Sequence, residues 1–373
     1  MKILIVASDK GNHFVPFIEE QMAALAQTGV EVERFGIMRK GAWGYLCEVP
    51  RLCRTLREVR PDLIHAHYGL SGLVAGLARL LCRISPCSKR RVGDIPVVTT
   101  YHGSDINDPA ILRLSCLAMR LSAWNIFVSQ RNVEIAVKAC AVRHYSLIPC
   151  GVDLSDDQLL TRTEARSRLA ATDMPCTVTD GTNRWQCTFH DIQDAPLILF
   201  AGAFDNPVKD APLAMQAVDC LSQSLSRSSA QDAQPGSVSG TTDSHLLGEA
   251  DTHLPLLFEL RGYSRSEVNL LMCAADCLLL TSRREGSPQV VKEAMACGCP
   301  VVSVDVGDVS ERLADLDGCY LATSRQPQEI ASLLSQALSS HHKTNGRQRL
   351  ADAGLTNTQV IQRLSAIYQN ITH

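Results

Sequence analysis

Several features that mark other protein classes are missing from this sequence. None of its 15 cysteines belongs to a C-x-x-C pair, and none has the spacing to histidine that metal sites use. No apolar run approaches the roughly 18–20 residues that span a bilayer. The opening "MKILIVAS" is too short for a signal peptide. We therefore expect a reduced, cytoplasmic protein with no metal site.

The glycine motif of dinucleotide enzymes is missing as well. No G-x-G-x-x-G follows the first apolar run, which argues against a dinucleotide oxidoreductase. The sequence does contain short apolar, β-branched runs that alternate with helical patterns. Runs without polar alternation are typical of strands buried on both faces. Each half therefore predicts a parallel sheet covered by helices, in a doubly wound α/β domain.

A chain of 373 residues is long enough for two such domains. We predict an N-terminal Rossmann-like domain at 1–152 and a C-terminal Rossmann-like domain at 153–355. A helix at 356–373 ends the chain, and packing back on the first domain is one option for it. Polar composition predicts irregular insertions at about 172–192 and 225–253.

Charge is divided unevenly between the two halves. Residues 1–152 contain 19 Lys and Arg against 12 Asp and Glu, whereas the remainder contains 17 against 27. A basic first half either faces an anionic partner or attracts the acidic second half. The sequence leaves both interpretations open.

The most specific signal is "EGSPQVVKEAMACGCPVV" at 285–302. Ser287 is typical of an N-cap and Pro288 of a first helical residue, so a helix is predicted to begin here. The backbone N–H groups of Gln289 and Val290 would then offer a phosphate site at the positive end of the helix dipole. Lys209, which follows the apolar run "LILFAGAF", adds a cation in the same domain.

Two glutamates flank this helix start. Glu293 lies about one and a half turns into the helix, where it can accept hydrogen bonds from ribose hydroxyls or pair with a nearby Lys or Arg as a surface glutamate. Glu285, in the loop, can reach the group beyond the phosphates. Their spacing also fits the roughly 5–9.5 Å between the carboxylates of a glycosidase. Glycoside hydrolysis, however, needs no anion site.

Together these residues resemble those of the retaining GT-B glycosyltransferases of family 4. The E-x₇-E motif of the family matches Glu285 and Glu293. Weaker segments occur in the family's order: "DLIHAH", "TTYHGSDI", "LIPCGVDL" and "FAGAFDNPVKD". The resemblance covers most of the chain. It implies the GT-B fold, in which two Rossmann-like domains face each other across a cleft, with 1–152 on the acceptor side and 153–355 binding the nucleotide sugar.

The resemblance also implies roles for individual residues. Glu285 would contact the transferred sugar, Glu293 the ribose and Lys209 the diphosphate. His102 would face sugar and acceptor, as an orienting group or a base, unless it is a structural loop histidine. The other implied donor-binding positions are Gly202, Gly286, Ser287, Pro288, Gln289 and Val290. The other implied positions in the loops of the first domain are Gly11, His13, Gly103 and Asp105.

Three positions depart from the family. Ala203 stands where an arginine usually partners the lysine, Cys150 replaces the Asn of the P-N-G-V-D turn, and the Gly-Gly loop after the first strand is reduced to 9–13. Loss of the arginine removes a charge-assisted contact worth about 1.5–3 kcal/mol. Arg283 or Arg284 is a candidate replacement.

The predicted function is transfer of a sugar from a nucleotide diphosphate, of UDP or GDP type, to a hydroxyl of a glycan or lipid-linked saccharide. The anomeric configuration would be retained, without cofactor or metal. The D-x-D triplet at 315–317 is interpreted as a solvated turn. Three alternatives stay open: a nucleotide-sugar epimerase, a sugar phosphorylase and a non-catalytic protein that binds a nucleotide sugar.

The first half also contains a basic amphipathic pattern at 49–60. Its apolar residues share one helical face, and its arginines, at 51, 54, 57 and 60, lie on the other half. With the basic run at 89–91, it predicts either peripheral docking at the inner face of an anionic membrane or an ordinary solvated helix. We expect no nucleic-acid partner.

Overall fold

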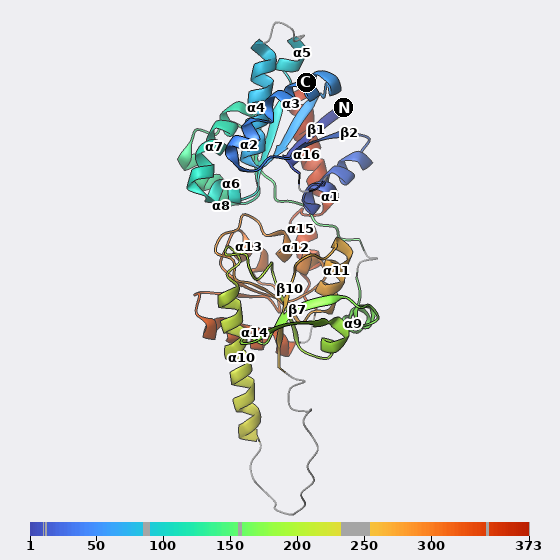
Figure 1. The fold of residues 1–373 in the computed structure, drawn as a ribbon, viewed down its shortest axis with the longest axis vertical. Helices are drawn as coiled ribbons and strands as arrows, with labels where there is room; N and C mark the ends of the chain where they lie inside the picture. The colour runs from blue at the N-terminus through green and yellow to red at the C-terminus, as the bar shows by residue number, and fades with distance from the viewer. Residues whose placement is uncertain are drawn as a thin grey trace, which may run out of the picture. The chain divides into compact units, whose positions relative to one another are not determined.

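The computed structural model describes residues 1–9, 11, 13–84, 90–155, 159–232, 254–340 and 343–372. Strands and helices alternate along most of this length (Figure 1). The strands are β1 (Lys2–Ser8), β2 (Glu31–Ile37), β3 (Leu63–His67), β4 (Val97–Tyr101), β5 (Trp124–Phe127), β6 (Tyr145–Leu147), β7 (Pro175–Thr179), β8 (Arg184–Thr188), β9 (Leu197–Phe200), β10 (Leu256–Glu259), β11 (Cys277–Leu280), β12 (Val301–Val304) and β13 (Tyr320–Ala322).

The helices vary from a single turn to six turns in length. They are α1 (Pro16–Gln27), α2 (Gly41–Leu46), α3 (Val49–Val59), α4 (Gly69–Ile84), α5 (Arg90–Gly93), α6 (Ser104–Asn107), α7 (Pro109–Leu121), α8 (Gln130–Ala139), α9 (Arg162–Ala170), the 3₁₀ helix η2 (Phe189–Ile192), α10 (Ala211–Asp232), α11 (Arg265–Ala274), α12 (Gln289–Ala296), α13 (Val309–Leu313), α14 (Pro327–Ser340), α15 (Gly346–Asp352) and α16 (Asn357–Thr372).

The chain forms two compact units. The first unit comprises Met1–Asp153, Arg284–Gln289 and Leu350–His373, and the second comprises Leu154–Arg283 and Val290–Arg349. The sequence placed its boundaries after 152 and 355, close to two of these limits. It did not indicate that 284–289 cluster with the first unit.

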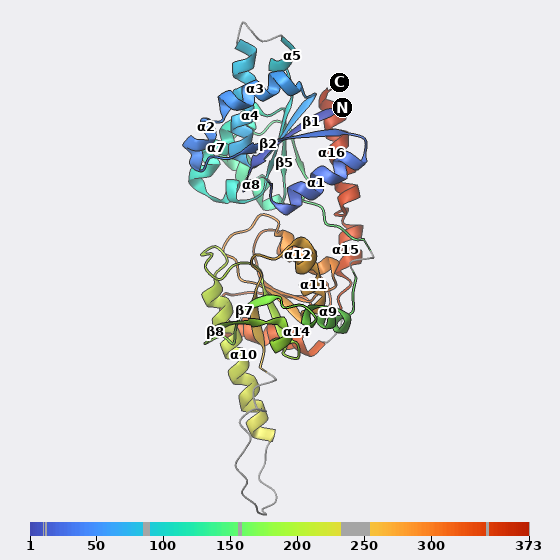
Figure 2. The same ribbon diagram turned by 45° about the vertical axis from the view of Figure 1, so that its right-hand side comes forward.

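The first unit is a parallel sheet with helices on both faces. Its strand order is β2-β1-β3-β4-β5-β6, and every pairing is parallel. Because successive side chains of a strand point to opposite faces, β1 serves two cores. Leu4 and Val6 pack with residues of α3 and α4, whereas Ile3 and Ile5 pack with residues of α1 and α16. Figure 2 shows these two pairs of helices on opposite sides of the sheet. The predicted doubly wound α/β fold is confirmed here.

The C-terminal helix α16 belongs to this first sheet. Val360, Ile361, Leu364 and Ile367 are buried in the core cluster that also contains Ile3. Two backbone hydrogen bonds tie the start of this helix to the segment that follows β6. Val152 N–H donates to Leu355 O at 3.0 Å, and Asn357 N–H donates to Val152 O at 3.0 Å. The helix therefore completes one face of the first unit.

The second unit contains a mixed sheet in the order β13-β12-β11-β9-β10-β7-β8. Five strands, β9 to β13, are parallel. As the apolar runs predicted, β9 to β12 are almost fully buried, whereas Tyr320 and Leu321 of the edge strand β13 are only partly buried. The antiparallel hairpin β7–β8 extends the sheet beyond β10.

This hairpin corrects the prediction that 172–192 is irregular. Cys176 and Val178 of β7 are buried against the core, while β8 is largely exposed. The turn fits its sequence, since the Asp180 carboxylate accepts from the N–H groups of Thr182 and Asn183, and Gly181 has φ 103°. A D-G pair between alternating strands is a hairpin signal. The polar composition of the segment concealed it.

The second predicted insertion is only partly described. The insertion expected at 225–253 begins as helix, since α10 continues to Asp232, and 233–253 lie outside the described residues.

In α3, the apolar residues Leu52, Cys53 and Leu56 pack into the core of the first unit. That apolar face is therefore not available to a lipid surface. In the described part of the chain, no helix combines the length and apolar character that a bilayer span requires.

Candidate functional site

In the second unit, candidate residues follow the carboxyl ends of the parallel strands, where ligands of open α/β sheets bind. The loop after β9 carries Gly202 and Lys209. A Cβ atom on Gly202 would lie 2.7 Å from Lys209 Cγ, so the lysine stem lies directly against this glycine. Thr281 Oγ1, just after β11, donates to Lys209 O at 2.9 Å. The backbone of Lys209 is thus tied to the end of the neighbouring strand.

A buried carboxylate next to Lys209 holds two arginines. Asp210 accepts from Arg283 Nε at 3.1 Å and Nη2 at 3.2 Å, and from Arg325 Nη2 at 2.8 Å. Arg325 also donates to the carbonyls of Thr281 and Ser282. Burial raises the pKa of Asp210, but the hydrogen bonds from Arg283 and Arg325 outweigh it and place the pKa below the usual carboxyl value. Two guanidinium groups therefore flank the Asp210 carboxylate, which is ionised at neutral pH.

One of these arginines can replace the guanidinium that is missing at Ala203, where the family usually has an arginine. Arg283, one of the two suggested replacements, is held by Asp210, the residue after Lys209. Arg284, the other, lies in the first unit, 4.0 Å from Asp108 Oδ2. The geometry therefore favours Arg283, and it adds Arg325, which the sequence gave no reason to select.

Glu293, on α12, has an ion-pair partner. Its Oε1 lies 2.6 Å from Arg265 Nη1, and the glutamate side chain is 13% exposed. Arg265 is held at the start of α11 by a capping box, in which Ser264 Oγ accepts from Glu267 N–H and Glu267 accepts from Ser264 N–H. The pairing expected for a surface glutamate is thus present, but the carboxylate is largely buried.

The helix start differs by one residue from the prediction. Helix α12 begins at Gln289, so Pro288 precedes it instead of opening it, and Ser287 lies in the preceding bend. A shift of one residue is within the spread of helix assignments. The first N–H groups, including those of Gln289 and Val290, still have no carbonyl partner within the helix.

The segment 284–289 packs on loops of the first unit. Asn107 Nδ2 donates to Glu285 O at 2.9 Å, and Gln289 Nε2 donates to Gly151 O at 2.7 Å. A Cβ atom on Gly103, whose φ is 108°, would lie 2.6 Å from Gly286 Cα. The two glycines are therefore needed for close backbone packing, a role distinct from the donor and acceptor contacts expected of them.

His102 lies among aromatic rings and a thiol. Its Nε2 is 3.0 Å from His67 Nδ1, and its Nδ1 is 3.6 Å from Cys150 Sγ. Its ring centroid lies 4.9 Å from that of Phe17 and 4.6 Å from that of Tyr68. Cys150, the residue that departs from the family turn, thus contacts the candidate catalytic histidine.

Two histidines of β3, His65 and His67, are completely buried. His65 Nδ1 is 2.6 Å from Tyr368 Oη and its Nε2 is 2.8 Å from Thr100 Oγ1. Burial lowers the pKa of His65 to about 3 and lowers that of His67 well below its ordinary value. Neutral His67 carries one N–H, so its contact with His102 requires one ring to donate and the other to accept.

The remaining loop candidates of the first unit have local roles. Asp105 accepts from the backbone N–H groups of Gly69, His102 and Gly103 at 2.9–3.0 Å. Burial raises the pKa of Asp105 to about 6, against the lowering effect of these donors. Its carboxylate therefore shapes the loop that carries His102. Gly11 and His13 are exposed, with His13 Nδ1 3.0 Å from Gly11 O.

Two family models match the chain, one over each half. Residues 9–156 match the model described as Glycosyltransferase Family 4, and residues 195–340 match the model described as Glycosyl transferases group 1. The chain is built from glycosyltransferase domains.

Relatives of these glycosyltransferase domains include two bacterial proteins. One, from Bacillus subtilis, is named as the teichuronic acid biosynthesis glycosyltransferase TuaC and is 27% identical over 270 residues, 68% of this chain and 56% of that protein. The other, a D-inositol 3-phosphate glycosyltransferase from Geodermatophilus obscurus, is 25% identical over 333 residues, 82% of this chain and 66% of that protein. The matches thus span between half and two thirds of these relatives.

Solved structures share the complete fold. Alr3699/HepE from Anabaena, determined in complex with UDP-glucose, has a TM-score of 0.65 and 19% identity, with 99% of this chain and 100% of that chain covered. The two α/β units are therefore those of the GT-B glycosyltransferase fold.

Sequence analysis did not select several side chains that contact the candidate residues of each unit. Arg265 and Arg325 lie in segments without a selected motif, and only the capping box "SRSE" marked the place of the first. His67 lies in "DLIHAH", where it resembles an ordinary strand residue. Among the described residues, no group of three or more His, Cys, Asp or Glu side chains could hold a metal ion. Asp315 and Asp317 are exposed in a turn between α13 and β13.

Proposed function

We propose that this protein transfers a sugar from a nucleotide-diphosphate donor to a hydroxyl acceptor, with retention of the anomeric configuration. The observation that carries the proposal is the cationic group at the strand ends of the second unit. Arg283 and Arg325 pair with one carboxylate, that of Asp210, which directly follows Lys209 in the chain, so three cations accompany one anion and a net positive charge is left for a diphosphate. The Anabaena protein, with the same fold, was crystallised in complex with UDP-glucose, which favours a uridine donor.

Donor binding would use two kinds of group. Lys209 and the N–H groups at the start of α12 would bind the diphosphate, because a helix N-terminus and an ammonium both favour negative charge. Glu293 would accept from the ribose hydroxyls. Arg265 pairs with Oε1 of this carboxylate, and we assign the ribose contact to its second oxygen, Oε2.

The proposed chemistry depends on charge that develops as the glycosidic bond breaks. Negative charge grows on the leaving diphosphate, so Lys209 stabilises the transition state more than the ground state. Glu285 would contact the transferred sugar and His102 the acceptor hydroxyl. The 3.0 Å contact with His67 supports one orientation of the His102 ring, which a group that orients or deprotonates an acceptor needs.

Ligand binding distinguishes the donor. In a thermal-shift comparison of UDP, GDP and ADP and their glucose conjugates, we expect the midpoint to rise with one base only, because a ligand that binds the folded state stabilises it by mass action. Incubation of that nucleotide sugar with candidate acceptors, followed by NMR of the product's anomeric proton, then tests transfer and retention. Absence of any shift with every nucleotide would overturn the proposal.

The same samples separate the alternatives. Donor isomerisation without an acceptor indicates an epimerase, and dependence on free phosphate indicates a phosphorylase. Binding without turnover against any acceptor indicates a non-catalytic protein. Transfer to a hydroxyl acceptor in phosphate-free buffer is the outcome that our proposal requires.

We further propose that the first unit contacts an anionic membrane, which would bring it to a lipid-linked acceptor. The segment from Met38 to Trp43 supports this. Met38 is 73% and Trp43 79% exposed, and Arg39 and Lys40 between them are also exposed. Exposed Trp and cations side by side are typical of interfacial anchors. Of the basic run predicted earlier, Lys89 lies outside the described residues, as do the side chains of Arg90 and Arg91.

A further inference from the structure

One thiol of the first unit lies against a histidine ring. The sulfur atom of Cys150 is 3.6 Å from His102 Nδ1, and the cysteine is partly exposed. The backbone holds this cysteine on both sides, because the N–H groups of Ile148 and Val152 donate to other segments at 2.9 Å and 3.0 Å. The N–H group of His102 is itself bound to a carboxylate oxygen at 3.0 Å. The fold therefore fixes the contact between the sulfur and the ring.

A chain of side chains sets the direction of the hydrogen bonds at this contact. Gln21 Nε2, an amide nitrogen that can only donate, is 3.5 Å from His67 Nε2. Burial lowers the pKa of His67 well below its ordinary value, so this ring is neutral and carries a single N–H. Because its Nε2 accepts, the proton is on Nδ1, from which it is donated to His102 Nε2 at 3.0 Å. His102 then carries its own proton on Nδ1 and donates it to the Cys150 sulfur.

This arrangement favours the nucleophilic form of Cys150. A hydrogen bond that is donated to a sulfur atom stabilises the charged thiolate more than the neutral thiol. The thiolate is the form of cysteine that attacks electrophiles. The constellation also follows the general pattern of an activated nucleophile, in which a third residue, here His67, orients the ring that contacts the nucleophile.

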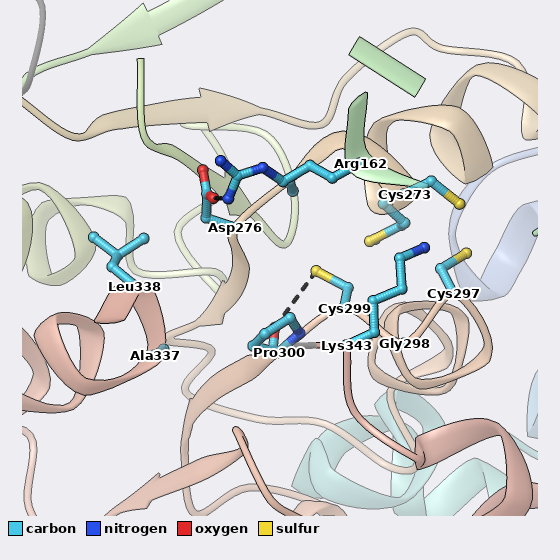
Figure 3. Close-up of a pocket in the computed structure, with 12 residues that line it drawn as sticks. Arg162, Cys273, Asp276, Cys297, Gly298, Cys299, Pro300, Ala337, Leu338 and Lys343 are labelled. Atoms are coloured by element: carbon cyan, nitrogen blue, oxygen red, sulfur yellow. Dashed lines mark hydrogen bonds and ion pairs between the residues drawn. The ribbon is translucent and has the colours of Figure 1, made fainter. Parts of the chain in front are cut away.

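Buried thiols of the second unit are held in the opposite way. Cys273, Cys297 and Cys299 line a cavity of about 50 Å³, and each is 2% exposed (Figure 3). Cys297 Sγ donates to Asn269 Oδ1 at 2.8 Å, and Cys299 Sγ donates to Pro300 O at 3.5 Å. A thiol that donates keeps its proton, and the cavity has room for water but not for a larger reagent. These cysteines are therefore natural controls for Cys150.

We propose that Cys150 is a modification site, at which a low-molecular-weight disulfide forms a mixed disulfide with the protein. The Cys150 thiolate, whose proton has passed to solvent, attacks one sulfur atom of the reagent. A new S–S bond forms at Cys150, the S–S bond of the reagent breaks, and its other half leaves as a thiolate that takes a proton from water. Cys150 is oxidised and the leaving half is reduced, so the exchange needs no further oxidant.

A mixed disulfide at Cys150 would lie beside the ring proposed to contact the acceptor. His102 Nε2 is engaged by His67, so Nδ1, which faces Cys150, is the nitrogen that could reach an acceptor hydroxyl. We therefore expect the modification to slow transfer and reduction to restore it. This consequence rests on the proposed function, whereas the exchange reaction itself does not.

Mass spectrometry of the full chain tests the modification site. The reduced protein is incubated with oxidised glutathione at neutral pH, sampled over time, blocked with N-ethylmaleimide in denaturant and digested with trypsin without reduction. Cleavage after Lys and Arg leaves Cys150 as the one cysteine of His144–Arg162 and Cys47 as the one cysteine of Gly41–Arg51. Cys47 is the more exposed thiol, so access alone would favour it. We expect glutathione to appear faster on Cys150 than on Cys47, and not on the cavity thiols.

Two variants connect the rate to the hydrogen bond from His102. His102→Leu removes the donor and should slow modification of Cys150 roughly 3- to 10-fold, because less of the sulfur is thiolate while each thiolate becomes somewhat more nucleophilic. The rate at Cys47 should not change. The exposed His144, changed to Gln, should leave both rates as in the wild type.

Circular dichroism confirms that each variant is folded, and His102→Asn replaces His102→Leu where it is not. Wild-type Cys150 that reacts no faster than Cys47, or a rate at Cys150 that is unchanged in the folded His102 variant, would overturn the proposal. Transfer activity before and after treatment is a separate measurement. Failure of the proposed function would therefore appear there and leave the peptide result intact.

Discussion

At the scale of single residues, Lys209 is the side chain whose removal tests the phosphate site most directly. We expect Lys209→Ala to weaken UDP binding roughly 10- to 100-fold, the equivalent of a charged hydrogen bond of about 1.5–3 kcal/mol. Its stem lies against Gly202, so no core contact is lost. Isothermal titration with UDP and with uridine checks the assignment, because uridine has no phosphate and its affinity should stay unchanged.

The matched control is Lys138→Ala, which removes an exposed lysine from α8 of the first unit. UDP affinity should be the same in this variant as in the wild type. Equal losses of UDP and uridine affinity in Lys209→Ala would show that the lysine acts through the fold and not through the diphosphate.

His65 should make the stability of the first unit depend on pH. Burial lowers its pKa to about 3 in the folded protein, from 6.5. Below pH 6.5 the unfolded chain therefore binds the proton that the folded chain excludes, so the free energy of unfolding falls as the pH falls from 6.5 toward 3. From pH 7.5 to 5.5 this one group should remove about 1.4 kcal/mol.

Urea unfolding of His65→Gln at the two pH values measures this contribution. The variant is expected to be less stable at both, because Tyr368 and Thr100 lose a partner, but its decrease on acidification should be smaller than that of the wild type. Introducing Trp185→Phe leaves Trp43 and Trp124 as the fluorophores, both in the first unit. The exposed His144, changed to Gln, is the control. An unchanged pH dependence in His65→Gln would contradict the prediction.

At the scale of elements, α16 should act as part of the first unit although it comes last in the chain. Leu364, 2% exposed, packs in the cluster that contains Ile3 and Ile5 of β1. Leu364→Ala should lower the free energy of unfolding of the first unit by about 2–5 kcal/mol. Gln369→Ala, on the exposed face of the same helix, should change it by less than about 0.5 kcal/mol. A loss in the transition of the second unit instead would contradict this assignment.

The buried strands of both units could be predicted because their residues are apolar without alternation. Runs such as "KILIVAS" and "CLLLTS" have no exposed face, and only a parallel sheet covered by helices satisfies them. The hairpin β7–β8 escaped because one of its strands is solvent-facing, so Arg184 and Gln186 alternate with few buried residues. Composition alone cannot separate such a strand from a loop.

The part of the candidate site that could be predicted is the start of α12, because local residue preferences mark a helix start. Pro288 and the preceding serine mark a helix start in any context. The partners of Glu293 and Asp210, in contrast, come from 28 and 115 residues away, at Arg265 and Arg325. Pairings over such distances depend on the strand order, which a single sequence does not contain. For the same reason, His67 became a neighbour of His102 only once β3 and β4 were paired.

At the scale of the whole molecule, the proposed contact with a membrane should depend on the exposed segment from Met38 to Trp43. The apolar face of α3 is buried in the core, so insertion by that helix is excluded as the mode of binding. Trp43 is expected to insert at the interface, and Arg39 and Lys40 to attract anionic lipid. Arg39 also lies 3.8 Å from Glu48, a weak pair that leaves its side chain 65% exposed.

Sedimentation with phosphatidylserine vesicles at low salt tests this contact. Replacing both Arg39 and Lys40 by Gln should weaken binding roughly 30-fold, at about 1 kcal/mol per cation, and should reduce the salt dependence. Trp43→Ser should weaken binding without changing the salt dependence, because it removes apolar burial only. Trp185→Ser, a partly exposed tryptophan of the second unit, should bind like the wild type. If Trp43→Ser and Trp185→Ser bind equally well, or if the wild type binds neutral phosphatidylcholine as tightly as phosphatidylserine, this segment is not the contact surface, and the acceptor must reach the first unit without its help.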